Sequence, residues 1–251
     1  MEHLEGRQSV LAALQARQRR IDVILLRHGI HEDPLREMLD LAAQLGVPVR
    51  YVASVELSQM THGATHGGVV AVASPKPRTT FDELLRLIEP VANPLLLLLE
   101  GIDDARNLGF VLRTAEAVGA HAVLIKKHLW DFDAVEIARP ASGAYERLPL
   151  VQIDQIQPLA TLKKRGVRII GCLAGARRSA FRTDFTGGVL ICVGGEKRGL
   201  SSALREICDR FVTIPMAGGA ASSLSLSHAS AILLGEALRQ RLKKTDAPPP
   251  A

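Results

Sequence analysis

The chain has 251 residues, of which 47% are hydrophobic and 23% charged, a composition typical of one or two folded domains rather than a disordered chain. The formal net charge of +5 is compatible with a phosphate-bearing partner such as RNA, although only 4% of the residues are aromatic and few could stack on bases. The longest apolar run, residues 95–99, is too short to cross a bilayer, and the N-terminus has no apolar secretion signal. We therefore expect a cytoplasmic protein with no membrane-spanning segment.

Residues 1–75 have the pattern of a small α/β domain. The segment 34–45 begins with Pro34 and ends before Gly46, which is the arrangement that marks the two ends of a helix. A loop is expected at 62–68, where several glycines interrupt regular structure. The other predicted elements of this domain are a helix at 6–16 and strands at 23–26, 49–52 and 69–73.

Residues 76–92 are predicted to be a linker, since two prolines interrupt the pattern and only a weak helical segment follows at 81–88. In residues 93–242 strands alternate with helices, which is the order required for a parallel sheet covered by helices on both faces. The expected strands are 95–99, 122–125, 167–173, 189–193 and 211–214, and the expected helices are 108–118, 156–164, 201–208 and 226–242. The charged, proline-rich end, 243–251, is expected to be unfolded.

Several common motifs are missing from the sequence. No G-x-G-x-x-G follows a predicted strand and no G-x-x-x-x-G-K-[ST] occurs, so a nucleotide-dependent oxidoreductase has no support beyond the α/β pattern. No residue pattern predicts a metal site. Cys172, Cys192 and Cys208 are widely spaced in apolar stretches, and they are expected to be reduced and mostly buried.

Three strand-to-loop junctions in the second half of the chain could carry chemistry. The first, 104–115, follows the strand predicted at 95–99. Asn107 lies where the helix begins, at the carboxyl end of a strand, which is where open α/β sheets hold ligands. Arg113 lies among apolar helix residues and must extend to solvent or meet an anion. The structural alternative is an N-cap asparagine and an arginine paired with a local acid.

Two further junctions follow later strands. The second, 193–201, contains Gly194 and Glu196, and its glycines allow the backbone to approach a ligand closely. The third, 214–229, begins with a long loop of small residues, whose free backbone amides and carbonyls suit an adenine or a sulfonium group. The structural alternatives are an ordinary turn with Ser201 as N-cap and a flexible loop before a capped helix.

In this order the three junctions resemble the three motifs of SPOUT methyltransferases of the TrmH type, over residues 93–242, and the stretch 139–149 resembles the connector between the first two motifs. Residues 1–75 resemble the ribosomal-protein-like RNA-binding domain of the 23S rRNA guanosine 2′-O-methyltransferases. The resemblance implies a C-terminal parallel-sheet domain with a deep trefoil knot, a homodimer, S-adenosyl-L-methionine as cofactor, and a ribose 2′-hydroxyl of RNA as methyl acceptor.

The resemblance also implies roles for single residues. Arg113 would promote attack by the 2′-hydroxyl, either as a base or, because a guanidinium has a pKa above about 12, by gripping the neighbouring phosphate. Asn107 would position the substrate or this arginine, and Glu196 would organise the second loop or contact the substrate. The residues implied to hold S-adenosyl-L-methionine, mainly through backbone groups, are Gly194, Ile214, Met216 and Leu224. Those implied for the dimer contact are Ala231, Ile232, Leu234 and Leu238 of the C-terminal helix.

Three positions depart from the family's pattern. Ser225, the fourth implied catalytic residue, stands where related enzymes carry asparagine; it keeps a hydrogen-bonding oxygen but loses the amide. Ala105 replaces a proline, and His228 replaces a small apolar residue and is expected to be a surface histidine without a ligand role. Ser225 therefore leaves open a knotted RNA-binding or ribosome-assembly protein without activity. A tRNA 2′-O-methyltransferase is the other alternative, because only the resemblance of residues 1–75 favours 23S rRNA as the substrate.

Overall fold

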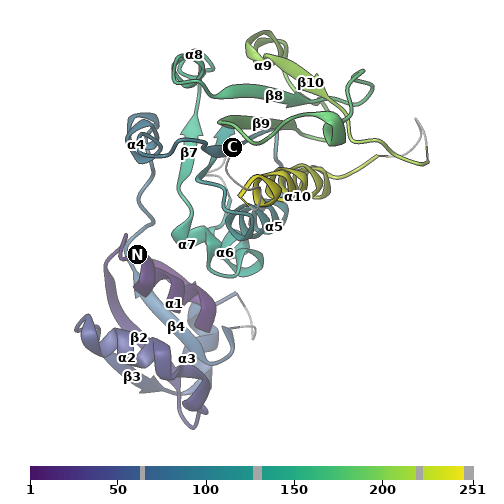
Figure 1. The fold of residues 1–251 in the computed structure, drawn as a ribbon. Helices are drawn as coiled ribbons and strands as arrows, with labels where there is room; N and C mark the ends of the chain where they lie inside the picture. The colour runs from purple at the N-terminus through teal and green to yellow at the C-terminus, as the bar shows by residue number, and fades with distance from the viewer. Residues whose placement is uncertain (63–65, 127–131, 219–222, 246–251) are drawn as a thin grey trace. The chain divides into compact units, whose positions relative to one another are not determined.

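The computed structural model describes residues 1–62, 66–126, 132–218 and 223–245 (Figure 1). The chain forms two compact units: unit 1 is Met1–Pro77 with Phe132–Arg147, and unit 2 is Arg78–Asp131 with Leu148–Ala251. The segment 132–147, which was expected to belong with 93–242, therefore lies in unit 1. It does so because its two short helices pack against the first strand and the first helix of the chain.

Unit 1 is built on a four-stranded mixed sheet in the order β1-β4-β2-β3. Strand β4 is antiparallel to β1 and β2, and β3 runs parallel to β2 at the other edge. The strands are β1 (Glu2–Glu5), β2 (Ile21–Arg27), β3 (Val49–Val52) and β4 (Val69–Ala73). The three strands predicted from the sequence are confirmed. Strand β1 was not predicted, because Glu-His-Leu-Glu has no run of apolar residues; pairing with β4 makes it a strand.

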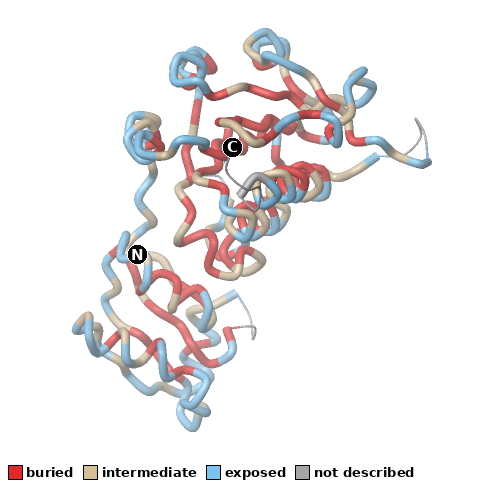
Figure 2. Tube along the Cα trace, viewed as in Figure 1, coloured by how far each residue is buried: buried red, intermediate tan, exposed pale blue. Residues whose placement is uncertain are grey.

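Helices cover both faces of this sheet. Leu14 of α1 and Met38 of α2 share one core cluster with Leu26, and Leu57 of α3 packs with Val70 in another. Figure 2 shows the buried residues running along the strands and the inner sides of the helices. The helices of unit 1 are α1 (Arg7–Ala16), α2 (Arg36–Gln44) after the 3₁₀ turn η1 (Asp33–Leu35), α3 (Ser54–Met60), α6 (Ala134–Ala141) and α7 (Ala144–Arg147). The helices predicted at 6–16 and 34–45 are confirmed, whereas residues 63–65 of the expected loop lie outside the described residues.

A buried cluster of charges holds the segment 132–147 in unit 1. The Arg19 guanidinium lies 3.1 Å from the carboxylate of Glu146 and 2.9 Å from that of Glu2. The side chains of Arg19 and Glu146 are only 1% and 2% exposed. Lys76 donates to the backbone carbonyl of Tyr145, and its ammonium lies 4.7 Å from the centre of the Tyr145 ring. Burial raises the pKa of Glu146 above its usual value and lowers the pKa of Lys76 to about 8.

Replacing Glu146 with glutamine should destabilise unit 1, because the buried Arg19 charge would lose one of its two carboxylate partners and keep only the more exposed Glu2. Removing one partner of a buried ion pair costs about 3–5 kcal/mol, so the midpoint of chemical unfolding should fall. Glu136→Gln, on the exposed side of α6, is the matched control and should leave the midpoint unchanged. Equal midpoints for the two variants would show that the Arg19–Glu146 pair does not hold this segment.

The unfolding free energy should also depend on Lys76 at alkaline pH. The pKa of Lys76 is about 8 in the folded protein and 10.5 in a free lysine, so the unfolded chain binds more protons between these values and stability rises with pH there. The rise should be about 3 kcal/mol, with no change below pH 8, where the lysine is charged in both states. Lys76→Met should lack this rise. The prediction would be contradicted if the unfolding free energies of the wild-type protein and of Lys76→Met changed with pH in the same way.

Unit 2 contains a six-stranded sheet in the order β10-β8-β9-β5-β6-β7, and each paired strand is parallel to its neighbour. The strands are β5 (Leu95–Glu100), β6 (Ala122–Lys126), β7 (Leu150–Ile153), β8 (Arg168–Cys172), β9 (Val189–Gly194) and β10 (Arg210–Val212). The predicted parallel α/β sheet is confirmed, with small shifts at the strand ends. Strand β7 was not predicted, because its four residues are too few to show a period and only pairing with β6 defines it.

Helices cover both faces of this sheet, and the strands are therefore apolar along nearly their whole length. Leu96 and Leu98 of β5 share a core cluster with residues of α4, α8 and α9. On the opposite face α5 and α10 pack against each other and against β6 and β9 (Figure 1). The helices of unit 2 are α4 (Phe81–Leu87), α5 (Ala105–Ala117), α8 (Leu159–Lys164), α9 (Ser202–Ile207) and α10 (Leu226–Thr245), with the 3₁₀ turn η4 (Ala180–Arg182).

The C-terminal end of unit 2 differs from the prediction. Helix α10 continues to Thr245, so residues 243–245 of the expected unfolded tail are helical, and 246–251 lie outside the described residues. The helix continues because the prolines that would stop it begin only at Pro248. In the described part of the chain no helix is long and apolar enough to cross a membrane. The three cysteines are free, one of them buried and two half-buried.

Candidate active site

The loops that follow β8, β9 and β10 meet at the carboxyl edge of the sheet and form a pocket with the start of α10. This edge is where open parallel sheets hold ligands. The pocket volume of about 380 Å³ lies within the range of about 300–1,000 Å³ for small-molecule sites. All four residues predicted to hold the cofactor line it, and Glu196 lines it with them: Gly194, Ile214, Met216 and Leu224.

The loop after β9 packs backbone against backbone. A Cβ atom on Gly194 would lie 2.2 Å from the carbonyl carbon of Gly199, and one on Gly195 would lie 2.3 Å from the carbonyl oxygen of Gly101. The N–H of Gly195 donates to the carbonyl of Glu100 at 2.6 Å, and that of Gly199 donates to the carbonyl of Gly195 at 2.8 Å. Only glycine fits at positions 194 and 195, because the chain here approaches its own backbone. The close approach of this backbone to a ligand stays a prediction.

Glu100 fixes the far end of the same loop, and this residue was not predicted from the sequence. Its carboxylate accepts a hydrogen bond from the N–H of Ser201 at 2.7 Å and forms an ion pair with Lys126. Lys126 also donates to the Ser201 hydroxyl at 3.1 Å. Burial would raise the pKa of Glu100, but the hydrogen bonds from Lys126 and Ser201 outweigh it, so the pKa is lowered and the carboxylate stays ionised. The available signal was a carboxylate that ends a strand of five leucines.

A chain of hydrogen bonds connects the start of α10 to α5. The Ser225 hydroxyl lies 2.6 Å from Nδ1 of His228 and 2.9 Å from the Ser227 hydroxyl. The Ser227 hydroxyl in turn donates to Oδ1 of Asn107 at 3.3 Å. Asn107 is not the N-cap of α5, because Asp104 holds that position and accepts a hydrogen bond from the N–H of Asn107 at 2.7 Å. The structure thus connects Asn107 to Ser225 through Ser227. His228, which was expected to be a surface histidine without a ligand role, belongs to the same chain of hydrogen bonds.

Arg113 lies on the exposed side of α5 with Arg106 and Phe110, and the Phe110 side chain is 52% exposed. In the part of the chain that the structure describes, Arg113 forms no hydrogen bond or ion pair, so the alternative of an arginine paired with a local acid is not supported. It does not line the pocket beside α10. Its guanidinium is therefore available to an anion from outside the chain.

The chain matches a known family over most of its length. Residues 94–235 match the SpoU rRNA methylase family, and residues 3–79 match the domain described as RNA 2′-O ribose methyltransferase substrate binding. The first match covers more than half of the chain and contains every residue that lines the pocket. The protein therefore belongs to the SpoU rRNA methylase family.

Individual relatives agree with this assignment. The 23S rRNA (guanosine-2′-O-)-methyltransferase RlmB of Vibrio vulnificus is 34% identical over 242 residues, which cover 96% of this chain and 98% of that protein. The RlmB of Pseudomonas putida is 37% identical over 248 residues, which cover 97% and 98%. Among solved structures, the SpoU methyltransferase AviRb from Streptomyces viridochromogenes in complex with the cofactor AdoMet has a TM-score of 0.80 and 26% identity, and the match covers 96% of this chain and 90% of that one. The family resemblance carried by the three motifs is confirmed.

Gly195→Ala should weaken binding of S-adenosyl-L-methionine, the cofactor that the motifs imply. The added methyl group would force the loop away from Gly101, and overpacking of this kind costs about 1–3 kcal/mol, which corresponds to an affinity loss of about fivefold or more. Calorimetry measures the affinity. Gly187→Ala is the control, because a Cβ there would meet only the end of the flexible Arg168 side chain. Unchanged affinity in Gly195→Ala would contradict the role assigned to the close backbone approach.

Proposed function

We propose that this protein transfers the methyl group of S-adenosyl-L-methionine to the ribose 2′-hydroxyl of a guanosine in 23S rRNA. The observation that carries the proposal is the pocket of glycine-bearing loops at the sheet edge, in a chain that aligns over nearly its whole length with proteins named for this activity. The related AviRb structure holds AdoMet, which supports the same cofactor here.

The residues of the pocket fit this cofactor. Apolar side chains such as Val193, Ile214 and Leu226 form a surface that suits an adenine ring. Glu196 and Arg205 also line the pocket, and their opposite charges suit a zwitterionic amino-acid group. When bound, S-adenosyl-L-methionine supplies an electrophilic methyl group on its sulfur. The loop glycines let the chain meet the rest of the molecule through backbone N–H and carbonyl groups.

Arg113 is proposed to hold an RNA phosphate beside the target ribose. A guanidinium with a pKa above about 12 is not a base at neutral pH, but its planar donors can grip a phosphate at two points. This grip would align the 2′-oxygen with the methyl group, and alignment of reacting atoms is a main source of rate acceleration. Asn107 lies closer to the start of α5 than Arg113 does. Its side chain accepts a hydrogen bond from Ser227, and from this position it would orient the substrate.

Ser225 and His228 are proposed to share the task of the asparagine found in related enzymes. The Ser225 oxygen caps α10 by accepting from the N–H of His228 at 3.3 Å. The imidazole Nδ1 of His228 lies 2.6 Å from the same oxygen and provides the nitrogen that the shorter serine lacks. The pair would therefore keep the polar chain to Asn107 intact.

We further propose that the protein is a homodimer that contacts its partner through α10. Ala231, Ile232 and Leu238 are half-buried in the single chain, and Leu242 is 55% exposed, so an apolar surface remains for a second copy. Leu234, also expected to contribute, is fully buried in the chain's own core and is not available. The trefoil knot stays a prediction from the family resemblance, and the cytoplasm, where ribosomes are assembled, is the proposed location.

A second candidate function is RNA binding without methylation, as in a ribosome-assembly protein. The observation that favours it is Ser225 in place of the asparagine of related enzymes. Calorimetry with S-adenosyl-L-methionine separates the two functions, since no binding at millimolar cofactor would favour the second. Methylation of tRNA is the alternative substrate choice, and mapping of the methyl marks distinguishes it.

Arg113→Ala should abolish methyl transfer without loss of cofactor binding. In a strain that lacks the gene, the wild-type protein should restore one 2′-O-methyl mark in 23S rRNA, and the variant should not, because the phosphate grip is gone. Its affinity for S-adenosyl-L-methionine should stay within a few-fold, since Arg113 does not line the pocket. Arg106→Ala removes the same charge from the same side of α5 and should keep most of the activity. Collapse of cofactor binding in Arg113→Ala would assign the arginine a structural role, and a restored mark in tRNA would replace the proposed substrate.

A further inference from the structure

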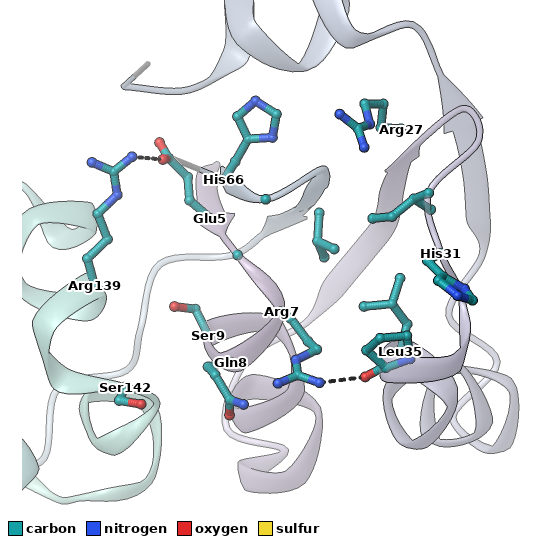
Figure 3. A pocket seen from close by; sticks show the side chains of 15 residues that line it. Glu5, Arg7, Gln8, Ser9, Arg27, His31, Leu35, His66, Arg139 and Ser142 are labelled. Carbon is teal, nitrogen blue, oxygen red and sulfur yellow. Dashed lines mark hydrogen bonds and ion pairs between the residues drawn. The ribbon is translucent and has the colours of Figure 1, made fainter. Parts of the chain in front are cut away.

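Unit 1 contains a second pocket, with a volume of about 680 Å³ (Figure 3). It is formed by the N-terminus of α1, the loop after β2, the turn η1, the start of β4 and helix α6. All residues that line it belong to unit 1. The volume is large enough for a nucleotide.

Three arginines line this pocket, and its one lining carboxylate neutralises only one of them. Arg139 donates to the Glu5 carboxylate at 2.6 Å. Arg7 donates to the neutral backbone carbonyl of Pro34 at 2.7 Å, and Arg27 has no ion pair with a described residue, so both keep their positive charge. Burial would raise the pKa of Glu5, but hydrogen bonds to its carboxylate and the charge of Arg139 outweigh this, so the pKa is lowered and Glu5 stays ionised. The pocket therefore favours an anion.

Three side chains with unused hydrogen-bonding groups line the same pocket. Ser9 is 5% exposed, and its hydroxyl has no hydrogen-bond partner in the described part of the chain; Figure 3 shows it on the side of α1 toward Arg139. His66 is also 5% exposed, and its Nδ1 accepts from the N–H of Gly68 at 3.0 Å, while its Nε2 has no hydrogen-bond partner among the described residues. Nε of Arg139 is likewise buried without a partner. Since buried polar atoms are nearly always paired, the unpaired Nε of Arg139, with the unused groups of Ser9 and His66 beside it, indicates a ligand.

The N-terminus of α1 supplies further donors. This helix has 10 residues, and its N-cap is Gly6, which has no side chain to satisfy the first N–H groups. The N–H groups of Arg7, Gln8 and Ser9 are therefore open to an anion, which the helix dipole also favours. The N-terminus of α1, the arginines and the side chains with unused hydrogen-bonding groups therefore line the same pocket.

We infer that this pocket binds one unstacked nucleotide of single-stranded RNA. The apolar residues Ile30, Leu35 and Val69 form a wall for the base, and Ser9 and His66 offer hydrogen-bonding groups to its edge. The adjoining phosphate lies against the N-terminus of α1 and Arg27. Proteins that recognise RNA by sequence commonly take unstacked bases into such pockets. The inference rests on the proposed function. It specifies how the protein binds a part of the RNA other than the nucleotide that is methylated.

The first test is binding of the full-length protein to a short fluorescent single-stranded oligoribonucleotide, measured by anisotropy over a range of salt concentrations. Each phosphate contact contributes about 0.7 to the slope of log affinity against log salt. Arg27→Gln should therefore weaken binding and reduce the slope by about that amount. Arg20→Gln is the matched control, because it removes the same charge from the same unit. The Arg20 side chain is 74% exposed and does not line the pocket, so the salt dependence of RNA binding should be unchanged in this variant.

The second test separates base recognition from folding. Ser9→Ala should weaken binding about fivefold, the effect of one hydrogen bond. Its unfolding midpoint should not fall, because the hydroxyl that is removed has no hydrogen-bond partner among the described residues and alanine is the best helix former. A purely structural serine would lower the midpoint as well.

The outcomes distinguish this inference from the proposed function. The inference would be overturned if Arg27→Gln and Ser9→Ala bound the oligonucleotide as tightly as the wild-type protein. It would also be overturned if Arg20→Gln lost as much affinity as Arg27→Gln. Binding of a free nucleoside monophosphate as tightly as the oligonucleotide would overturn it too, since the site would then serve small nucleotides. Absence of methyl transfer by the wild-type protein, with the losses in Arg27→Gln and Ser9→Ala intact, would overturn the methyltransferase function and leave the RNA pocket standing.

Discussion

The candidate active site depends on the close packing of the loop after β9 against neighbouring backbone. Gly194 and Gly195 bring the end of β9 so close to Gly101 and Gly199 that a methyl group on either residue would overlap main-chain atoms. Glu100 then holds the other end of the loop through the N–H of Ser201. A loop fixed at both ends presents its peptide groups in one arrangement, so little conformational entropy is lost when a ligand binds.

Packing of two helices that are distant in the sequence completes the site. Helices α5 and α10 lie against each other on one face of the sheet, and this brings Asn107 within 3.3 Å of Ser227. Ser225 and His228 join the same polar chain. Arg113 stays outside this chain of hydrogen bonds and is exposed on α5. The two helices thus present a hydrogen-bonded polar chain and, apart from it, one exposed charge.

Unit 1 is more than an N-terminal appendage. The segment 132–147 contributes Glu146 to the buried charge cluster and Arg139 to the second pocket, although it follows β6 of unit 2 in the chain. Deleting residues 1–77 would leave Glu146 without Arg19 and Lys76, so such a truncation would disturb folding as well as RNA binding. Substitutions on the pocket surface are therefore the cleaner probe of RNA recognition.

The sequence by itself determined the class of fold, because apolar strands alternating with amphipathic helices have few other solutions, and the three junction motifs are local patterns that carry their own glycines and polar residues. It singled out Gly194, Ile214, Met216 and Leu224, which line one pocket in the structure; their role in holding the cofactor stays a prediction. Only the tertiary structure decided what depends on contacts between distant residues. Strands β1 and β7 exist through pairing with β4 and β6, the buried partners Glu100 and Lys126 meet across neighbouring strands, and 132–147 joins unit 1 because burying its carboxylate requires the guanidinium of Arg19. Such contacts leave no periodic signal along the chain, since the cost of a buried charge is relieved only by a partner that folding brings near.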